Sequence, residues 1–241
     1  MKTTILSILA IFTLSTGTCV AKGGGGDDTK IVVGVSVGAG MPMGAFGTKD
    51  KNSSATDTTH TNGWAKTGFH FDVNFGYKFS DNIGGMVMIG GNMNGFDATT
   101  YDTKYNNKAG TTTATSYYTG SYLIGPFLNF PVGDKFAITA RVLGGLMTSK
   151  SATLSQDIPV LGTATQTMGS VSTFGYDAGV GAKIGLTDML GLGLNADYLG
   201  GTPTFTTYTT TFGGKTSTST GHKIAMGTGI INLSVGLVLS F

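Results

Sequence analysis

The sequence predicts an all-β protein, an eight-stranded antiparallel up-and-down transmembrane β-barrel. Apolar and polar residues alternate with a period of two in eight segments, and this period is typical of strands whose two faces differ. Long and short connections alternate between the segments, and the last segment ends on an aromatic residue, Phe241. The 40 glycines disfavour a helical fold, because each one destabilises a helix by about 1 kcal/mol.

The start of the chain is expected to be a cleaved signal peptide, residues 1–21. Lys2 precedes a short apolar stretch, and small residues before Ala21 form a cleavage site. A lipoprotein acylated at Cys19 is the alternative, although Thr18 stands where Gly, Ala or Ser is needed.

Two further segments complete the expected domain organisation. Residues 22–29 are polar and rich in glycine, and they are expected to form a flexible periplasmic tether. Residues 30–241 are expected to form the barrel.

The first four strands are expected at 30–41, 67–79, 83–94 and 116–130. The second is the clearest, because aromatic residues crowd one face and polar residues the other. The aromatic face carries Phe69, Phe71, Val73, Phe75, Tyr77 and Phe79. Pro126 interrupts the fourth strand and removes a ladder donor, so a β-bulge is expected there.

The last four strands are expected at 135–147, 172–186, 190–199 and 229–241. Each alternates aliphatic or aromatic residues with glycine, polar or charged residues. In the final strand every second residue is apolar from Ile231 to Phe241, with small or polar residues between most of them. Each segment therefore satisfies the pattern of a strand with one apolar face.

The connections indicate how the strands close. Four polar loops are expected at 47–63, 95–115, 148–171 and 200–227, and they alternate with three short turns. An even number of antiparallel strands lets the first pair with the last, and a closed sheet has no free edge in a bilayer. A strand of about 11 residues, at about 3.3 Å each and tilted by about 40°, spans roughly 28 Å of hydrocarbon. A soluble lipocalin-like barrel is the alternative, but the signal peptide and the aromatic residues near strand ends favour the membrane form.

These features resemble the small outer-membrane β-barrel family of Gram-negative bacteria, of the OmpA transmembrane-domain and OmpX kind within the porin-like superfamily. The resemblance covers most of Lys30–Phe241 and is one of pattern rather than of a catalytic motif. It implies export through the periplasm to the cell outer membrane and contact with outer-membrane lipid. It also implies that Phe241 is the assembly signal read by the barrel-assembly machinery.

The inward face of such a barrel is expected to hold a polar cluster centred on Arg141, the only arginine. Its members are Asp72, Lys78, Arg141, Asp177, Lys183, Asn195 and Asp197. Three aspartates balance three cations, and pairing is expected because a lone buried charge is costly. A regular hairpin places Arg141 opposite Gly125, with room to reach Asp72 or Asp197. The cluster is interpreted as a plug, or alternatively as part of a narrow path.

Several classes of function are disfavoured by composition. Cys19 is the only cysteine, so disulfides and thiolate chemistry are not expected in the mature chain. The precursor has a net charge of +2, and its basic residues form no stripe along the sequence, so nucleic acid is not an expected partner. The three histidines share no metal-ligand spacing, and no nucleophile is placed beside His70 and Asp72. Catalytic residues, metals and cofactors are therefore not expected, and neither is enzymatic activity.

The expected function is a structural or surface-interaction role through the four long loops, because loops on a rigid scaffold carry recognition. Their ligand is not identified by the sequence. A small passive channel for ions or small solutes is the alternative, favoured by the many glycines on the inward face. A membrane-embedded lipid-modifying enzyme or protease is the third candidate.

Overall fold

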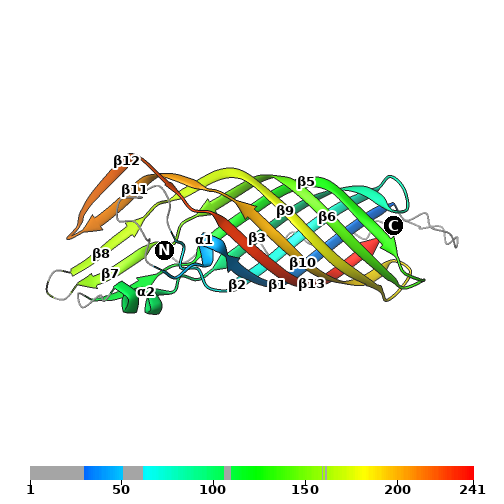
Figure 1. Ribbon diagram of the computed structural model, residues 1–241, viewed down its shortest axis with the longest axis horizontal. Helices are drawn as coiled ribbons and strands as arrows, with labels where there is room; N and C mark the ends of the chain where they lie inside the picture. Colours follow the sequence, from blue (N-terminus) through cyan, green and yellow to red (C-terminus); the bar gives the residue numbers. More distant parts are fainter. Residues whose placement is uncertain (1–29, 51–61, 106–109, 159, 161) are drawn as a thin grey trace.

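The computed structural model describes residues 30–50, 62–105, 110–158, 160 and 162–241. Eight antiparallel strands form a closed barrel in the order β1-β13-β10-β9-β6-β5-β3-β2, which confirms the predicted fold class (Figure 1). These strands are β1 (Ile31–Met43), β2 (Gly68–Lys78), β3 (Ile83–Asn94), β5 (Tyr117–Pro131), β6 (Phe136–Lys150), β9 (Ser170–Gly185), β10 (Leu190–Gly201) and β13 (Thr228–Ser240). The predicted signal peptide and tether lie outside the described residues.

The first and last strands close the barrel along their whole length. Their pairing runs from Val32 opposite Ser240 to Met43 opposite Gly229. Two further backbone hydrogen bonds join Ile31 and Phe241, at 3.0 and 2.9 Å between nitrogen and oxygen. No barrel strand therefore has an unpaired edge, which is the condition that hydrocarbon imposes on a sheet.

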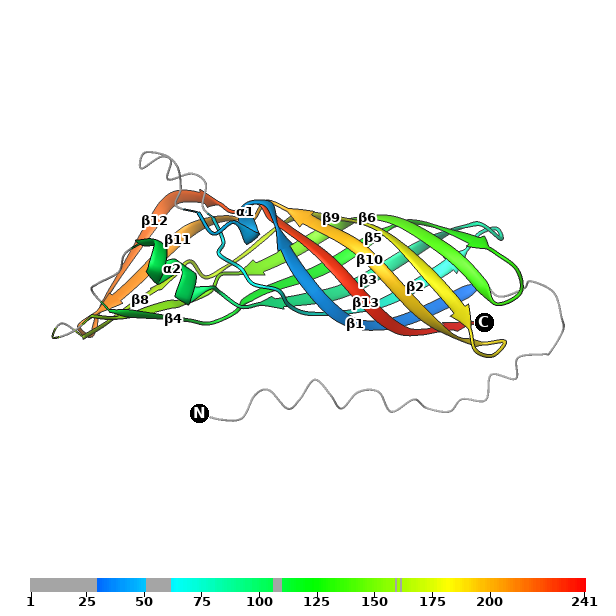
Figure 2. The ribbon, with the colours of Figure 1, turned by 60° about the horizontal axis from the view of Figure 1, so that its bottom comes forward.

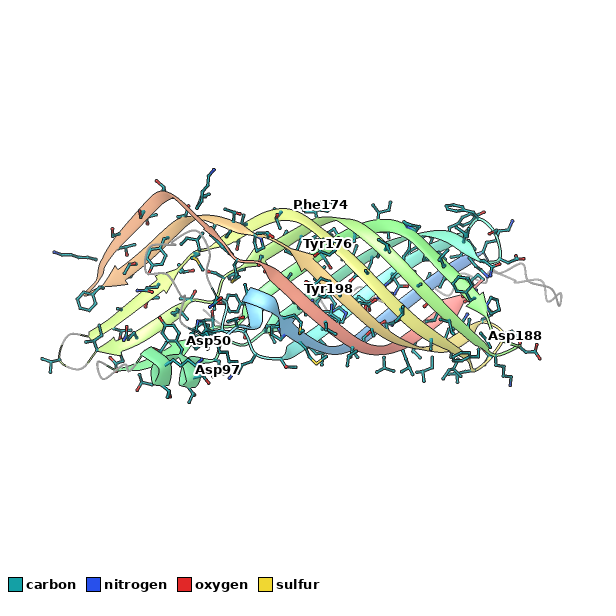
Figure 3. The ribbon with its side chains drawn as sticks, in the orientation of Figure 1. Asp50, Asp97, Phe174, Tyr176, Asp188 and Tyr198 are labelled. Carbon is teal, nitrogen blue, oxygen red and sulfur yellow. The ribbon has the colours of Figure 1, made fainter. Side chains whose placement is uncertain are left out.

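The barrel is apolar outside and polar inside. Aromatic and aliphatic side chains are exposed on its outer surface, among them Phe174, Tyr176 and Tyr198 in Figure 3. The buried polar side chains of the barrel strands include Ser36, His70, Asp72, Asn74, Asn92, Thr119, Ser121, Asp177, Asp197, Asn232 and Ser234. This arrangement is the reverse of a lipocalin, and it defines a membrane-spanning barrel.

The expected long polar loops at one end are wrong in part, because much of their length is regular structure. Two short helices occur there, α1 (Gly44–Gly47) and α2 (Ala98–Tyr105). A second sheet has the order β12-β11-β8-β7-β4. Its strands are β4 (Thr111–Ala114), β7 (Leu154–Ile158), β8 (Gly162–Thr167), β11 (Thr204–Phe212) and β12 (Lys215–Ala225). No helix of the described chain is long and apolar enough to cross a bilayer.

The second sheet lies beyond the barrel, at the end opposite the C-terminus (Figures 1 and 2). Its strands are rich in β-branched threonine, which suits an exposed pleated surface. Gly213 and Gly214 connect β11 to β12 with φ of +56° and +76°. Positive φ at both central residues is the requirement of a type I′ hairpin turn, which glycine meets without strain.

The barrel strands also extend further into the loops than expected. Strand β6 continues to Lys150, β9 begins at Ser170 and β10 continues to Gly201. In β6 the extension consists of Thr148, Ser149 and Lys150, so the alternation of apolar and polar residues that marks the rest of the strand is lost there. Most of the expected loop at 47–63 falls on residues 51–61, which lie outside the described residues.

The β-bulge expected at Pro126 is wrong. The β5–β6 pairing runs through Ile124 opposite Gly144 and resumes at Phe127 opposite Arg141, so the register does not shift. Two residues on each strand are skipped, because proline has no N–H to donate. On its other side β5 keeps unbroken pairing with β3, with Pro126 opposite Gly85. This continuous ladder holds the strand in register across the gap.

Candidate functional site

The outer end of the barrel is closed by an apolar core. Tyr117 and Ile230 point inward at the ends of β5 and β13 and are almost completely buried. The core also contains Phe46, Trp64, Ala65, Phe96, Ala152, Phe205 and Met226. The Tyr117 hydroxyl donates to the Gly63 carbonyl over 2.7 Å, and its ring meets Phe46 edge-on at 5.2 Å. Residues from four different loops thus form one cap over the lumen.

Ion pairs connect the parts of this cap. Lys49 Nζ lies 2.6 Å from Asp97 Oδ2, and Lys104 pairs with Asp50 (Figure 3). Asp97 also accepts the Thr100 amide over 3.2 Å, as an N-cap of α2. The Lys49 hydrogen bond holds the pKa of Asp97 below its ordinary value. These contacts join the segment after α1 to α2.

The two edges of the outer sheet differ. At one edge, α2 covers β4, and Asp102 Oδ2 accepts the Thr112 amide over 2.9 Å. At the other edge, β12 is paired with β11 alone within the described chain. The side chains from Lys215 to Gly221 are exposed. One edge is therefore capped by a helix, and the other presents its backbone to solvent.

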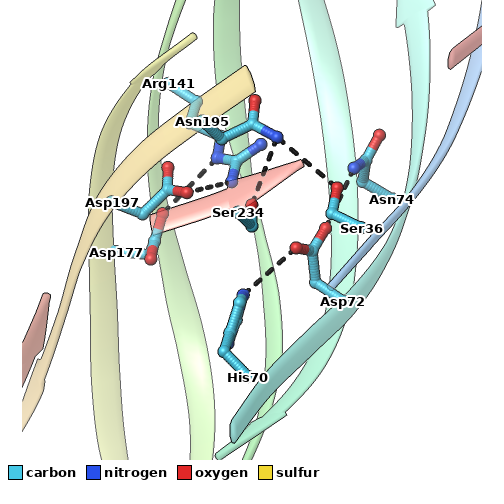
Figure 4. Close-up of polar contacts among 9 residues, drawn as sticks. All are labelled: Ser36, His70, Asp72, Asn74, Arg141, Asp177, Asn195, Asp197 and Ser234. Atoms are coloured by element: carbon cyan, nitrogen blue, oxygen red, sulfur yellow. Dashed lines mark hydrogen bonds and ion pairs between the residues drawn. The ribbon is translucent and has the colours of Figure 1, made fainter. Parts of the chain in front are cut away.

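In the lumen, Arg141 lies beside two aspartates (Figure 4). Its Nη2 is 2.7 Å from Asp197 Oδ2, and its Nε is 3.6 Å from Asp177 Oδ1. The expected opposition of Arg141 and Gly125 is wrong, because Arg141 pairs with Phe127 and Gly179. Gly179 provides the room instead, since a Cβ there would lie 1.6 Å from Asp197 Oδ1.

Asp72 belongs to a second polar group. Its carboxylate lies 3.2 Å from His70 Nε2 and accepts Asn74 Nδ2 over 3.1 Å. Asn195 Nδ2 lies 3.4 Å from the hydroxyls of both Ser36 and Ser234, between the two groups. Arg141 thus contacts Asp197 rather than Asp72.

The predicted lysines of the cluster lie toward the short turns. Lys183 donates to the Ser240 hydroxyl over 2.5 Å, and Lys78 is the last residue of β2. The expected balance of three aspartates and three cations is therefore spread along the lumen. Arg141 lies beside Asp177 and Asp197, and His70 lies beside Asp72.

The sequence analysis missed an apolar cluster inside the lumen. Its members are Met86, Met88, Leu123, Phe127, Leu143, Met147 and Leu199. They come from β3, β5, β6 and β10, strands that also carry inward polar residues such as Thr119, Arg141 and Asp197, so apolar and polar side chains share the lumen. The sequence did contain an indication of this cluster. These large apolar residues occupy the positions of each strand that face the lumen, where they stand among glycines.

Several buried polar atoms of the lumen have no hydrogen-bond partner among the described residues. They include His70 Nδ1, both side-chain polar atoms of Asn92 and Asn232 Oδ1. Buried polar groups are normally satisfied by protein or by water, so these atoms favour a hydrated interior. No group of three or more metal-ligating side chains is placed to hold a metal within the described chain.

Comparison with known proteins adds evidence on the fold. No protein-family model matches the chain, and no curated protein sequence matches it. The structure is similar to the outer membrane protease OmpT of Escherichia coli, with a TM-score of 0.51, 10% identity, and coverage of 92% of this chain and 99% of that one. It is also similar to a major outer membrane protein of Thermus thermophilus (TM-score 0.47, 13% identity, 88% and 99% covered). Ail, the attachment invasion locus protein of Yersinia pestis, gives a TM-score of 0.45 at 11% identity, with 88% and 99% covered.

At these identities the similarity is one of fold. The closed barrel and its apolar outer surface define the class of protein, a small outer-membrane β-barrel. The resemblance to barrels of the OmpA and OmpX kind, predicted from the strand pattern, is confirmed at this level.

Proposed function

We propose that this protein is a surface-interaction protein of the outer membrane and that its outer sheet binds a partner outside the cell. The observation that carries the proposal is the open edge of β12, on a sheet that three loops build together. The sheet stands on the apolar cap, so its position relative to the barrel is fixed by packing. Recognition on such a rigid support avoids much of the entropy cost of ordering a loop.

An open edge of this length is unusual in a protein without a strand-binding partner. Natural sheets cover, shorten or charge their edges, because an unpaired edge templates further strands. The short edge at β4 is covered in this way by α2 and Asp102. Strand β12 contains 11 residues and no proline, and within the described chain no strand pairs with its outer edge. Its two lysines stand near its ends and leave residues 216–221 between them without a charge. Addition of an extended segment to such an edge is a common mode of protein recognition.

Charge defines the partner further. Lys215 and Lys223 are the charged residues of β12, and β11 has none. A second copy pairing antiparallel with β12 would bring these lysines near each other, and like charges destabilise a strand pair. An extended acidic segment of another protein fits this edge better.

The proposal is tested with a synthetic peptide of alternating threonine and valine that carries aspartates at both ends. Hydrogen exchange of the barrel in lipid nanodiscs should show slower exchange of β12 amides with the peptide, and unchanged β4 amides. An analogue that is N-methylated at alternate residues lacks half of the donors and should not protect β12. Equal protection by both peptides, or none by either, would overturn the proposal.

A charge-reversed protein provides the matched variant. Lys215→Glu with Lys223→Glu should weaken binding of the acidic peptide several-fold, because surface charge pairs contribute modestly. Lys135→Glu makes a similar change in the turn before β6 and should leave binding unchanged. A loss in the Lys135 variant alone would contradict recognition by β12.

A passive channel is the second candidate, favoured by the buried lumen atoms that lack protein partners. The apolar cap and the apolar cluster of the lumen oppose it, since both occupy the path along the barrel axis. Single-channel recording of the refolded barrel beside Arg141→Ala separates the two functions. Reproducible steps that increase in the variant would support the channel, and silence in both would exclude it.

The third candidate, a lipid-modifying enzyme or protease, has no comparable support among the described residues. His70 Nε2 faces Asp72, and Nδ1 has no hydrogen-bond partner there. The similarity to the protease OmpT is one of fold alone.

A further inference from the structure

Lys150 is the one charged side chain on the outward face of the eight barrel strands, all of which the structure describes. The other outward positions carry aliphatic, aromatic, glycine, proline, serine or threonine residues. Lys150 is exposed, and its Nζ lies 5.9 Å from the centre of the outward Tyr118 ring. A lysine on the lipid face is unfavourable near the bilayer centre and nearly neutral at the interface. Its presence at one outward position therefore points to a particular use.

The lysine lies at the outer end of the barrel wall. It is the last residue of β6, at the end of the barrel away from the short turns. Along the strand pairing it continues a row of large outward residues, with Tyr118 opposite Lys150 and Met93 opposite Tyr118. The ammonium lies over the Tyr118 ring, and a tyrosine beside a lysine is typical of the level where lipid headgroups meet the hydrocarbon.

Directly below this row the barrel surface is hollowed. Gly91 pairs with Gly120, and Gly120 pairs with Thr148, so three small residues follow one another across three strands. The Phe71 ring lies over Gly91, and the hollow is therefore left at Gly120 and Thr148. The next row down is large again, with Ile89 opposite Tyr122. The result is a groove of about 480 Å³ that Lys150 borders at its outer end. This volume is within the range of roughly 300–1,000 Å³ that is common for small-molecule sites.

We propose that this groove binds one anionic lipid of the outer leaflet, with an acyl chain over Gly120 and Thr148 and the phosphate at Lys150. The occupant is a lipid because the groove opens on the hydrocarbon side of a barrel whose other outward residues there are apolar or uncharged. The headgroup is anionic because a basic residue at the interface attracts acidic lipids. The aromatic walls, Phe71 and Tyr122, supply rigid contact area for the chain.

The test measures which lipids remain on the purified mature barrel. Protein is taken from nanodiscs of phosphatidylcholine containing a minority of phosphatidylglycerol, and retained lipid is counted by native mass spectrometry. Phosphatidylglycerol should be retained about fivefold over its share in the disc, the effect of one interfacial lysine. Lys150→Gln should remove this preference, and Lys150→Arg should keep it. Lys215→Gln removes the same charge from the outer sheet and should change nothing.

A second variant tests the groove separately from the charge. Gly120→Leu fills the groove from outside, where a Cβ meets only the Thr148 hydroxyl. It should reduce retention of both lipids, while heat-modifiable migration on gels verifies that the barrel has folded. The proposal is overturned if Lys150→Gln keeps the preference or if Gly120→Leu retains lipid like the wild type. It is also overturned if inorganic phosphate displaces the lipid, because a free anion would then be the ligand.

Discussion

Removing the arginine of the lumen tests whether the polar cluster holds the barrel together. In Arg141→Met the side chain keeps much of its length and loses its charge. Asp177 and Asp197 then remain buried without their cation, since both carboxylates are at most 2% exposed. The expected result is a barrel that folds but unfolds at a lower denaturant concentration.

The size of the effect follows from the two distances. At an effective dielectric constant of about 20, separations of 2.7 and 3.6 Å correspond to attractions of about 6 and about 5 kcal/mol. Desolvation of the three charges offsets most of this attraction. Removing one member of a buried ion pair typically costs about 3–5 kcal/mol, because the remaining charge is left uncompensated. We expect a loss in that range, a large part of the roughly 5–15 kcal/mol that stabilises most proteins.

The assay is equilibrium unfolding in urea of the barrel refolded into lipid vesicles, followed by circular dichroism of its strands. Lys135→Met removes an exposed charge from the turn before β6 and serves as the control. Asp177→Asn and Asp197→Asn, added to Arg141→Met, remove the charges of the arginine and of both its aspartate partners. This triple variant should recover most of the lost stability, because neutral groups avoid the cost of buried charge.

A loss below about 1 kcal/mol in Arg141→Met would refute the reasoning, since it would match an ion pair in water. The lumen around Asp177 and Asp197 would then be well hydrated, and the passive channel would gain support. A triple variant less stable than Arg141→Met would equally contradict the electrostatic explanation.

Three further predictions concern the lumen, the cap and the outer sheet. Gly179→Ala should destabilise the barrel by about 1–3 kcal/mol in urea unfolding, because its Cβ would displace the Asp197 carboxylate, whereas Gly85→Ala on the outer surface should change little. Asp97→Asn should speed amide exchange in the cap at neutral pH, because it removes the ion pair with Lys49. The loss of local stability should be at most about 1 kcal/mol, since Lys49 is 40% exposed and water weakens the pair. In the wild type the same acceleration should appear only below about pH 4, because the lowered pKa of Asp97 makes its stabilisation present above the unfolded value and lost on acidification. Alanine at both positions of the 213–214 turn should weaken the β11–β12 hairpin by about 1–2 kcal/mol per residue, measured by exchange of its amides, and unchanged exchange would exclude the type I′ turn.

The barrel could be predicted because each of its strands alternates apolar and polar side chains with a period of two, and this pattern is visible within a short stretch of sequence. In β2 a residue such as Phe75 must face lipid if Asp72 faces the lumen, and the two-residue period assigns every other side chain of the strand. The order of short and long connections then gave closure of β1 on β13. The inward phase also placed Asp177 and Asp197 on the same side of the wall as Arg141.

The errors arose where register or distant packing decides the outcome. Arg141 was expected opposite Gly125 but lies opposite Phe127, because β5 continues to Pro131 and the turn follows it. A hairpin register depends on the turn geometry, which the alternation does not fix.

The outer sheet gave a different kind of error. Strands β11 and β12 carry threonine and serine on both faces, so they lack the contrast that marks a half-buried strand. The cap joins Phe46 to Phe205, residues far apart in the sequence, and no periodicity within either segment indicates such a contact.

Because three loops share one hydrogen-bonded sheet, their lengths are coupled during evolution. An insertion within β8 would displace its pairing with both β7 and β11, and so alter two other loops at once. A change of length at a hairpin tip such as 213–214 alters the turn of that hairpin alone and leaves the strands of the other two loops in place. A lineage under immune pressure would therefore vary the residues on the faces of this sheet and the tips of its hairpins, while the spacing of its strands stayed constant.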